Sequence, residues 1–184
     1  MPISFKTYER VALEDGDGHW ELVCGHLQKK PPMTLPHNDA IDGLTSTLSR
    51  QLDRNSYRLR SEDALLRISP TNAFQPDLFV LPQSARLKKQ AEHSSGLEMY
   101  DEPMPLVVEV WSPSTGDYDV NTKIPEYQRR GDAEIWLIHP YERWLRAWRR
   151  QADGRYRETL FRGEAVVEPV ALPGVRVTLA TLFE

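Results

Sequence analysis

The stretch PLVVEVWS at residues 105–112 decides the fold, because it is the strongest β-strand signal in the chain. Its nearly continuous apolar run is typical of a strand covered on both faces of a sheet. EIWLIHP at residues 134–140 has the same character, and residues 122–130 between them predict a helix that ends at Gly131. With a further short strand expected in FQPDLFVLP at 74–82, the middle of the chain reads strand, strand, helix, strand.

More helices and strands are expected on both sides of this centre. Apolar residues at steps of three and four predict an amphipathic helix from His37 to Arg54. Together the elements predict an α+β (mixed α/β) domain with a central mixed sheet flanked by helices and antiparallel hairpins at both ends. The other expectations are a short helix at 4–14, two strands within 19–30 that turn near Gly25, a rigid loop at Pro31, Pro32 and Pro36, a strand at 57–68, a polar surface loop at 83–102, and an antiparallel meander of two or three strands at 144–150, 155–161 and 165–170.

Composition narrows the class of protein. A chain of 184 residues that is 40% hydrophobic and 27% charged fits one globular domain over residues 1–184, and excludes a fibrous or wholly disordered chain. The single Cys24 cannot form an internal disulfide or a Cys-based zinc site, which suits a reducing cytoplasm. No apolar run reaches the ~18 residues of a membrane span. A net charge of −4 is not that of a protein that coats nucleic acid, although a local basic groove stays possible.

Two acids stand where the pattern predicts burial. Glu109 interrupts the most apolar strand, and Asp77 follows Pro76 in FQPDLFV. A carboxylate inside a sheet is costly unless it is paired, hydrogen-bonded or metal-bound, and two carboxylates favour Mg²⁺ or Mn²⁺. Lys123, on the helix that follows, could direct its ammonium to the same point and assist phosphodiester hydrolysis. Each acid alone is more often the partner of an arginine or lysine, and a lone helix lysine is more often solvated.

Three strings resemble the Uma family of bacterial nucleases, in the PD-(D/E)xK superfamily: PDLFV at 76–80, PLVVEVWSPST at 105–115 and DVNTKIPEYQRRGDAEIWLIHP at 119–140. The resemblance implies a restriction-endonuclease-like fold in which Asp77 is the PD acid and Glu109 the second acid. The usual superfamily lysine position is Trp111 here, so the family resemblance assigns the lysine to Lys123. Glu21, in a hairpin that also resembles the family, is either a further carboxylate near the metal or a structural partner of Lys123 or an arginine.

The resemblance implies a Mg²⁺- or Mn²⁺-dependent endonuclease that hydrolyses DNA phosphodiester bonds, as a cytoplasmic protein and a possible homodimer. Asp77 and Glu109 would bind the metal, Lys123 would assist water attack, and Glu21 is a second-tier catalytic candidate. The alternative is a catalytically inactive module of this fold that binds nucleic acid or protein. His139-Pro140 and Asp132 depart from the family pattern. The seven arginines at 143–162 either meet phosphates or line a solvated face opposite Trp144 and Trp148, and His37 is assigned only a role at the start of its helix.

Overall fold

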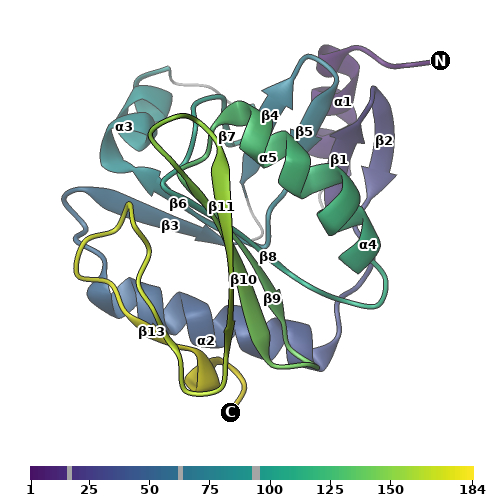
Figure 1. Ribbon diagram of the computed structural model, residues 1–184. Helices are drawn as coiled ribbons and strands as arrows, with labels where there is room; N and C mark the ends of the chain where they lie inside the picture. The colour runs from purple at the N-terminus through teal and green to yellow at the C-terminus, as the bar shows by residue number, and fades with distance from the viewer. Residues whose placement is uncertain (16–17, 62–63, 93–95) are drawn as a thin grey trace.

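The computed structural model describes residues 1–15, 18–61, 64–92 and 96–184, whose strands form a six-stranded, a five-stranded and a two-stranded sheet (Figure 1). In the six-stranded sheet one neighbouring pair is parallel and the others are antiparallel. The α+β class with a central mixed sheet is therefore confirmed. The strand order is β11 (Tyr156–Arg162), β10 (Trp144–Arg150), β9 (Glu134–His139), β8 (Leu106–Val110), β6 (Leu78–Pro82) and β3 (Tyr57–Ser61).

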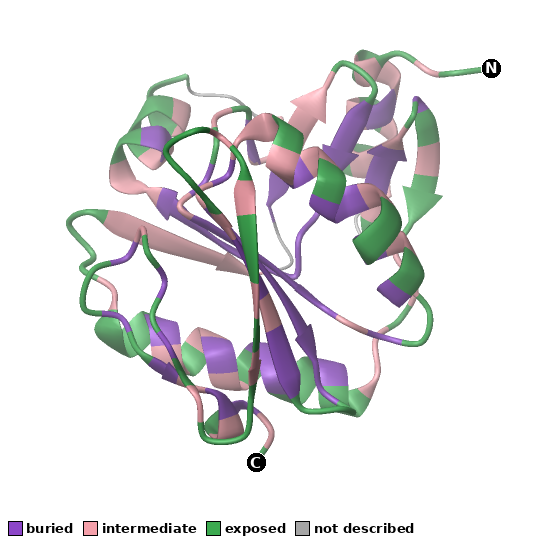
Figure 2. Cartoon of the chain, viewed as in Figure 1, coloured by how far each residue is buried: buried purple, intermediate pink, exposed green. Residues whose placement is uncertain are grey.

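The parallel pair at the centre consists of β8 and β9, in a register that sets Glu109 opposite Leu137. Every residue of both strands is buried, as their continuous apolar character predicts (Figure 2). Parallel neighbours need a crossover connection, and here it is helical from Gly116 to Arg130. The helix predicted at 122–130 therefore begins earlier than expected, and it ends at Gly131 as predicted, where φ is 91°. The crossover consists of α4 (Gly116–Tyr118), a π-helical turn (Asp119–Lys123) and α5 (Ile124–Arg130).

The second sheet lies beside the first and contains the N-terminal hairpin of β1 and β2 (Figure 1). The single strand predicted at 57–68 is wrong, because β3 belongs to the first sheet and β4 to the second; residues 62–63 of that stretch lie outside the described residues. FQPDLFVLP also divides between the sheets, since Pro76 lacks the N–H that would continue a ladder. The order is β2 (His26–Lys29), β1 (Trp20–Val23), β5 (Asn72–Phe74), β4 (Leu65–Ser69) and β7 (Met99–Tyr100).

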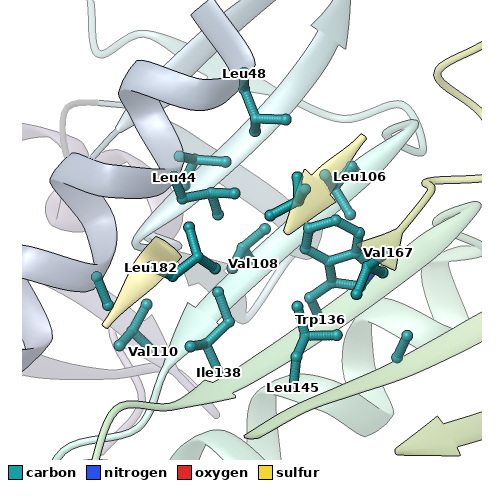
Figure 3. Close-up of a cluster of buried hydrophobic side chains, with 14 of the residues drawn as sticks. Leu44, Leu48, Leu106, Val108, Val110, Trp136, Ile138, Leu145, Val167 and Leu182 are labelled. Carbon is teal, nitrogen blue, oxygen red and sulfur yellow. The ribbon is translucent and has the colours of Figure 1, made fainter. Parts of the chain in front are cut away.

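One face of the central sheet is covered by α2 (Leu35–Gln51), the amphipathic helix predicted from the apolar spacing. Its buried stripe packs on β8 and β9 through Val108 and Trp136 (Figure 3). The helix begins before His37, so Pro36 belongs to its first turn and not to the preceding loop. A proline costs little there, because the first N–H groups of a helix have no partner within it. The stripe consists of Ala40, Ile41, Leu44 and Leu48.

The C-terminal segment covers the rest of this face. β12 (Val166–Val167) pairs with β13 (Val177–Thr178), and a 3₁₀-helix (Leu179–Leu182) follows. Of the two or three meander strands expected, 144–150 and 155–161 form as β10 and β11, whereas 165–170 contains only β12, which pairs with β13 and not with β11. Val167 and Leu182 join the core beneath α2 (Figure 3).

The remaining helices are short. α1 (Phe5–Glu14) starts at Ser4, whose side chain accepts a hydrogen bond from the Thr7 N–H at 3.1 Å. The loop predicted at 83–102 is wrong in part, because α3 (Gln83–Ala91) and β7 form there, while residues 93–95 lie outside the described residues. α3 contains good helix formers and buries Ala85. Within the described ranges, none of the helices has the length and apolar character needed to cross a membrane.

The arginine-rich hairpin differs from the simple alternation expected of it. Trp144 and Trp148 are buried on the α5 side of β10, but Arg146 lies on the same side as both. Its guanidinium is 5.3 Å and 5.9 Å from their ring centroids and forms an ion pair with Glu158 at 3.3 Å. Stacking on the rings lets a cation cover apolar surface while staying partly hydrated.

Glu134 is a buried acid with a structural role, on the face of β9 that α2 and the C-terminal segment cover. Its Oε1 accepts hydrogen bonds from Trp136 Nε1 at 2.6 Å and Arg149 Nε at 3.0 Å. Its Oε2 accepts one from the Val170 N–H at 2.7 Å. These bonds attach the C-terminal segment to the sheet.

Replacing Glu134 by alanine should therefore lower the free energy of unfolding by roughly 2–4 kcal/mol, because it leaves Arg149 and the Val170 N–H without their acceptor. Glu168→Ala is the matched control, since its ion pair with Arg176 at 3.3 Å is exposed. The control should change stability by less than about 0.5 kcal/mol. Urea unfolding of both variants measures the difference, and equal midpoints would contradict the structural role.

Candidate active site between the two sheets

The candidate site lies where the two sheets meet the helical crossover. Along β6, Leu78 and Val80 join the core beneath α2, so Asp77 and Phe79 fall on the opposite side. The same alternation along β8 turns Glu109 away from α2 and toward α5. Asp77 stands immediately before β6, at the point where the chain leaves one sheet for the other. Two acids from different strands are thereby directed into one space.

That space is a small cavity of about 10 Å³, room for about one water molecule. It brings together all four residues predicted for the site, including Glu21 from β1 of the second sheet. The N-terminal hairpin with the loop after it, the start of β6, β8 and the helical crossover therefore supply its walls. The complete lining is Glu21, Gln28, Lys30, Pro31, Asp77, Glu109, Thr115, Tyr118, Asp119 and Lys123.

Lys123 is the central cation of the cavity and is 1% exposed, which excludes a solvated helix residue. Its Nζ lies 2.9 Å from Glu21 Oε1 and 3.3 Å from Glu109 Oε1. It also lies 3.5 Å from Asp119 Oδ1, one turn earlier in the crossover. Burial acts to lower the pKa of Lys123, but these carboxylates outweigh it and raise the pKa well above its ordinary value. The ammonium is therefore charged and holds three acids together.

The π-helical turn Asp119–Lys123 carries both the lysine and an additional acid. Pro125 lies two residues after this turn, in the first turn of α5, and a proline cannot donate the hydrogen bond that a regular helix interior requires. π-Helical turns are frequent at functional sites. Asp119 Oδ1 is buried and, among the described residues, receives no hydrogen bond.

Asp77 is held by partners that the sequence did not reveal. Its Oδ2 accepts a hydrogen bond from the Val110 N–H at 2.7 Å and also lies 3.2 Å from His37 Nε2. Its Oδ1 accepts one from Lys30 Nζ at 2.9 Å. Burial acts to raise the pKa of Asp77, but Lys30 and His37 outweigh it and hold the pKa well below its ordinary value. Asp77 is therefore ionised, and the fully buried His37 supports it from outside the cavity lining and is not merely a residue at the start of a helix.

Two tyrosines orient the other acids. Tyr127 donates its hydroxyl hydrogen to Glu109 Oε1 at 2.6 Å, and Tyr118 donates to Glu21 Oε2 at 3.0 Å. The Gln75 N–H also donates to Glu21 Oε1 at 2.8 Å. Glu21 therefore contacts Lys123 and the backbone of the segment that carries Asp77, which joins the two sheets across the cavity.

The cavity carries more negative than positive groups. Four carboxylates against the ammonium groups of Lys30 and Lys123 leave a formal charge of −2, before His37 is counted. Burial, followed by the neighbouring acids Asp119 and Asp77, raises the pKa of Glu109 well above its ordinary value although Lys123 opposes the shift. Burial likewise raises the pKa of Asp119 to about 6. Once all four carboxylates are ionised, the site is therefore short of positive charge.

A hard divalent cation fits this donor chemistry. Carboxylate oxygens are the ligands that Mg²⁺ prefers, and Asp119 Oδ1 lies 3.5 Å from Lys123 Nζ but accepts no hydrogen bond within the described part of the chain. The ammonium groups, however, stand between the acids. In the described ranges no three His, Cys, Asp or Glu side chains converge as a ready-made metal site. A metal ion would therefore require a lysine to move.

The signals for the three missed residues differ. Asp119 is four residues before Lys123 and therefore shares its helical face, which is a usable signal. Lys30 gave no sequence signal for a place in the site, because a lysine in LQKK beside two prolines is typical of solvated loops. His37 was noticed, but its contact with Asp77 spans 40 residues of sequence.

The departures from the family pattern also have places in the structure. Trp111, at the usual lysine position, stacks on His139 with ring centroids 4.3 Å apart. Asp132 accepts a hydrogen bond from the Met104 N–H at 2.6 Å, and its Oδ1 forms an ion pair with Arg130 Nη2, also at 2.6 Å. Trp111, His139 and Asp132 therefore form contacts outside the cavity lining.

Metal-free protein should lose stability as pH rises from about 4 to about 6. The folded-state pKa of Asp119 is about 6 against an ordinary 3.8, so the folded state binds more protons in that window. The difference corresponds to about 3 kcal/mol. Asp119→Asn should reduce the decline, and the raised pKa of Glu109 should leave a remainder.

Urea unfolding in the presence of a chelator at several pH values measures the slope. Asp117→Asn, an exposed position of the same crossover, is the control and should keep the wild-type slope. An unchanged slope in Asp119→Asn would contradict the assigned environment of this carboxyl group.

Comparison with known proteins identifies the fold and the family. The crystal structure of a putative nuclease belonging to DUF820 from Anabaena variabilis superposes with a TM-score of 0.75 and 19% sequence identity, over 99% of this chain and 98% of that one. This likeness shows the restriction-endonuclease-like fold. A search of curated proteins gave no significant match. The Uma2 family model, described as putative restriction endonuclease, matches residues 5–180, and the chain therefore belongs to the Uma2 family.

Proposed function

We propose that this protein is a Mg²⁺- or Mn²⁺-dependent endonuclease that hydrolyses phosphodiester bonds in DNA, with residues 1–184 acting as one domain. The observation that carries the proposal is the convergence of four carboxylates and Lys123 on one buried cavity. With those four carboxylates ionised, the cavity carries a net negative charge that a cation beyond the two lysines would balance. Family membership supports the same reading.

Asp77 and Glu109 are proposed to hold the metal. Asp77 is ionised and presents Oδ1 to the cavity, while Glu109 is oriented by Tyr127. Asp119 is a third candidate ligand, because its Oδ1 is buried and among the described residues accepts no hydrogen bond. A bound Mg²⁺ would polarise a phosphoryl oxygen and lower the pKa of a coordinated water.

Lys123 is proposed to orient the attacking water and to stabilise the charge that develops on the phosphoryl group. An ammonium can do this only if it stays protonated, and the surrounding acids raise its pKa. Glu21 is proposed as a positioning residue, because its carboxylate lies 2.9 Å from the ammonium and is itself fixed by Tyr118 and the Gln75 N–H. This role combines the two readings of Glu21 that the sequence left open.

Wild-type protein should convert supercoiled plasmid to nicked or linear DNA with Mg²⁺ or Mn²⁺ and not with a chelator. Asp77→Asn, Glu109→Gln and Lys123→Met should each lower the initial rate by about 100-fold or more, because each removes a charge in the reacting region. Gel electrophoresis over time measures the rates.

The matched controls are Glu168→Gln and Lys29→Gln, which remove an exposed acid and an exposed lysine and should cleave like wild type. Cleavage retained in all three site variants would refute the proposed site. Wild-type protein that binds DNA but cleaves it with neither metal would favour the alternative, a non-catalytic nucleic-acid-binding module.

A further inference from the structure

Lys30 lies at the boundary between the carboxylate cavity and a larger open pocket. Its Nζ lies 2.9 Å from Asp77 Oδ1 and 3.1 Å from the Gln75 carbonyl oxygen, and its side chain is 9% exposed. It also lines the open pocket, of about 380 Å³, together with His19, Pro31 and Asn38. Lys30 and Pro31 are common to the linings of both spaces.

The other partners of Asp77 are not free to leave. The Val110 N–H belongs to the backbone of a buried central strand, and the His37 imidazole is fully buried on α2. Both engage Oδ2. Oδ1 is therefore the atom through which Asp77 can accept a cation from the cavity, and Lys30 Nζ is the group that now contacts it.

We propose that Lys30 is an internal counter-ion that occupies the cation position of Asp77 and that a divalent metal must displace. This inference deepens the proposed function, since it rests on Asp77 as a metal ligand. A dication and an ammonium cannot share one carboxylate oxygen in a buried cavity without strong repulsion. Metal binding and release of Lys30 are therefore one linked event.

The open pocket gives the Lys30 ammonium a route from Asp77 into water. An ammonium that leaves Asp77 toward this pocket enters water, and so avoids the cost of a buried unpaired charge. Lys123 has no comparable route, since its side chain is 2% exposed and three carboxylates surround it. Of the two lysines in the cavity lining, Lys30 is thus the exchangeable cation and Lys123 the resident one. The release also opens the wall between the cavity and the pocket.

Mn²⁺ binding without nucleic acid tests the competition. Lys30→Gln, which keeps a neutral hydrogen-bond donor near Asp77, should bind Mn²⁺ at least about tenfold more tightly than wild type, because the competing charge is gone. Lys30→Arg keeps the charge and should bind no more tightly than wild type. Lys29→Gln is the matched control on the neighbouring, exposed residue and should stay within about twofold of wild type. Electron paramagnetic resonance of free Mn²⁺ gives each Kd.

Equal or weaker Mn²⁺ binding by Lys30→Gln, or no binding by any variant at millimolar Mn²⁺, would overturn the inference. The tighter Mn²⁺ binding of Lys30→Gln should vanish in the double variant Lys30→Gln with Asp77→Asn. Tighter binding that persists in the double variant would place the metal away from Asp77 and would also overturn the inference. DNA is absent throughout. A failed cleavage assay with the expected Kd ratio would therefore refute the nuclease and leave the competition standing.

Wild-type protein provides a second measurement that does not depend on the folding of any variant. The Lys30 ammonium should give a slowly exchanging ¹⁵N NMR signal, because it is buried and hydrogen-bonded. Saturating Mg²⁺ should release the Lys30 ammonium into water, where fast proton exchange broadens its signal as it does for an exposed lysine. The Lys123 signal should stay unchanged. An unchanged Lys30 signal at saturation would show that both cations coexist at Asp77 and would refute displacement.

Discussion

The organisation of the site depends on one buried ammonium, that of Lys123. It holds Glu21 of one sheet, Glu109 of the other and Asp119 of the crossover within 3.5 Å of a single atom. Without it, three acids would face each other in a buried site of low dielectric constant, where like charges repel strongly. Removing one member of such a cluster leaves an uncompensated buried charge. The lysine is therefore a structural requirement of the cavity as well as its proposed catalytic group.

The chain passes from the second sheet to the first at the cavity that holds the acids. Pro76 interrupts the ladder between β5 and β6, and the chain crosses from one sheet to the other with Asp77 at the crossing. Glu21 then spans the junction, because its carboxylate binds both Lys123 and the Gln75 N–H. At this break the buried Gln75 N–H donates to Glu21 and the buried Val110 N–H donates to Asp77, so backbone groups help to hold the acids.

A buried acid in a strand is not by itself a functional signal, as Glu134 shows. Glu109 and Glu134 lie on neighbouring strands and both are fully buried. Glu134 faces α2 and is satisfied by Trp136, Arg149 and the Val170 N–H. Glu109 faces the cavity, where burial raises its pKa and where it shares the Lys123 ammonium with Glu21 and Asp119. The two carboxylates therefore differ in charge balance, because Glu134 is paired with Arg149 while three acids share Lys123.

The sequence by itself determined the two buried strands β8 and β9, the helix between them and the amphipathic α2, and it singled out the acids Asp77 and Glu109. These patterns are local: apolar runs, helical spacing, and charges inside apolar strands. The proposed roles of Lys123 and Glu21 came from the family resemblance. Only the tertiary structure decided that residues 57–68 and 74–82 divide between two sheets, that Lys30 and Asp119 line the cavity, and that His37 contacts Asp77. Lys30 and His37 meet Asp77 across 47 and 40 residues of sequence, and no local pattern encodes such a contact. Packing of the two sheets brings these groups together, and the cost of burying charge then determines how they pair.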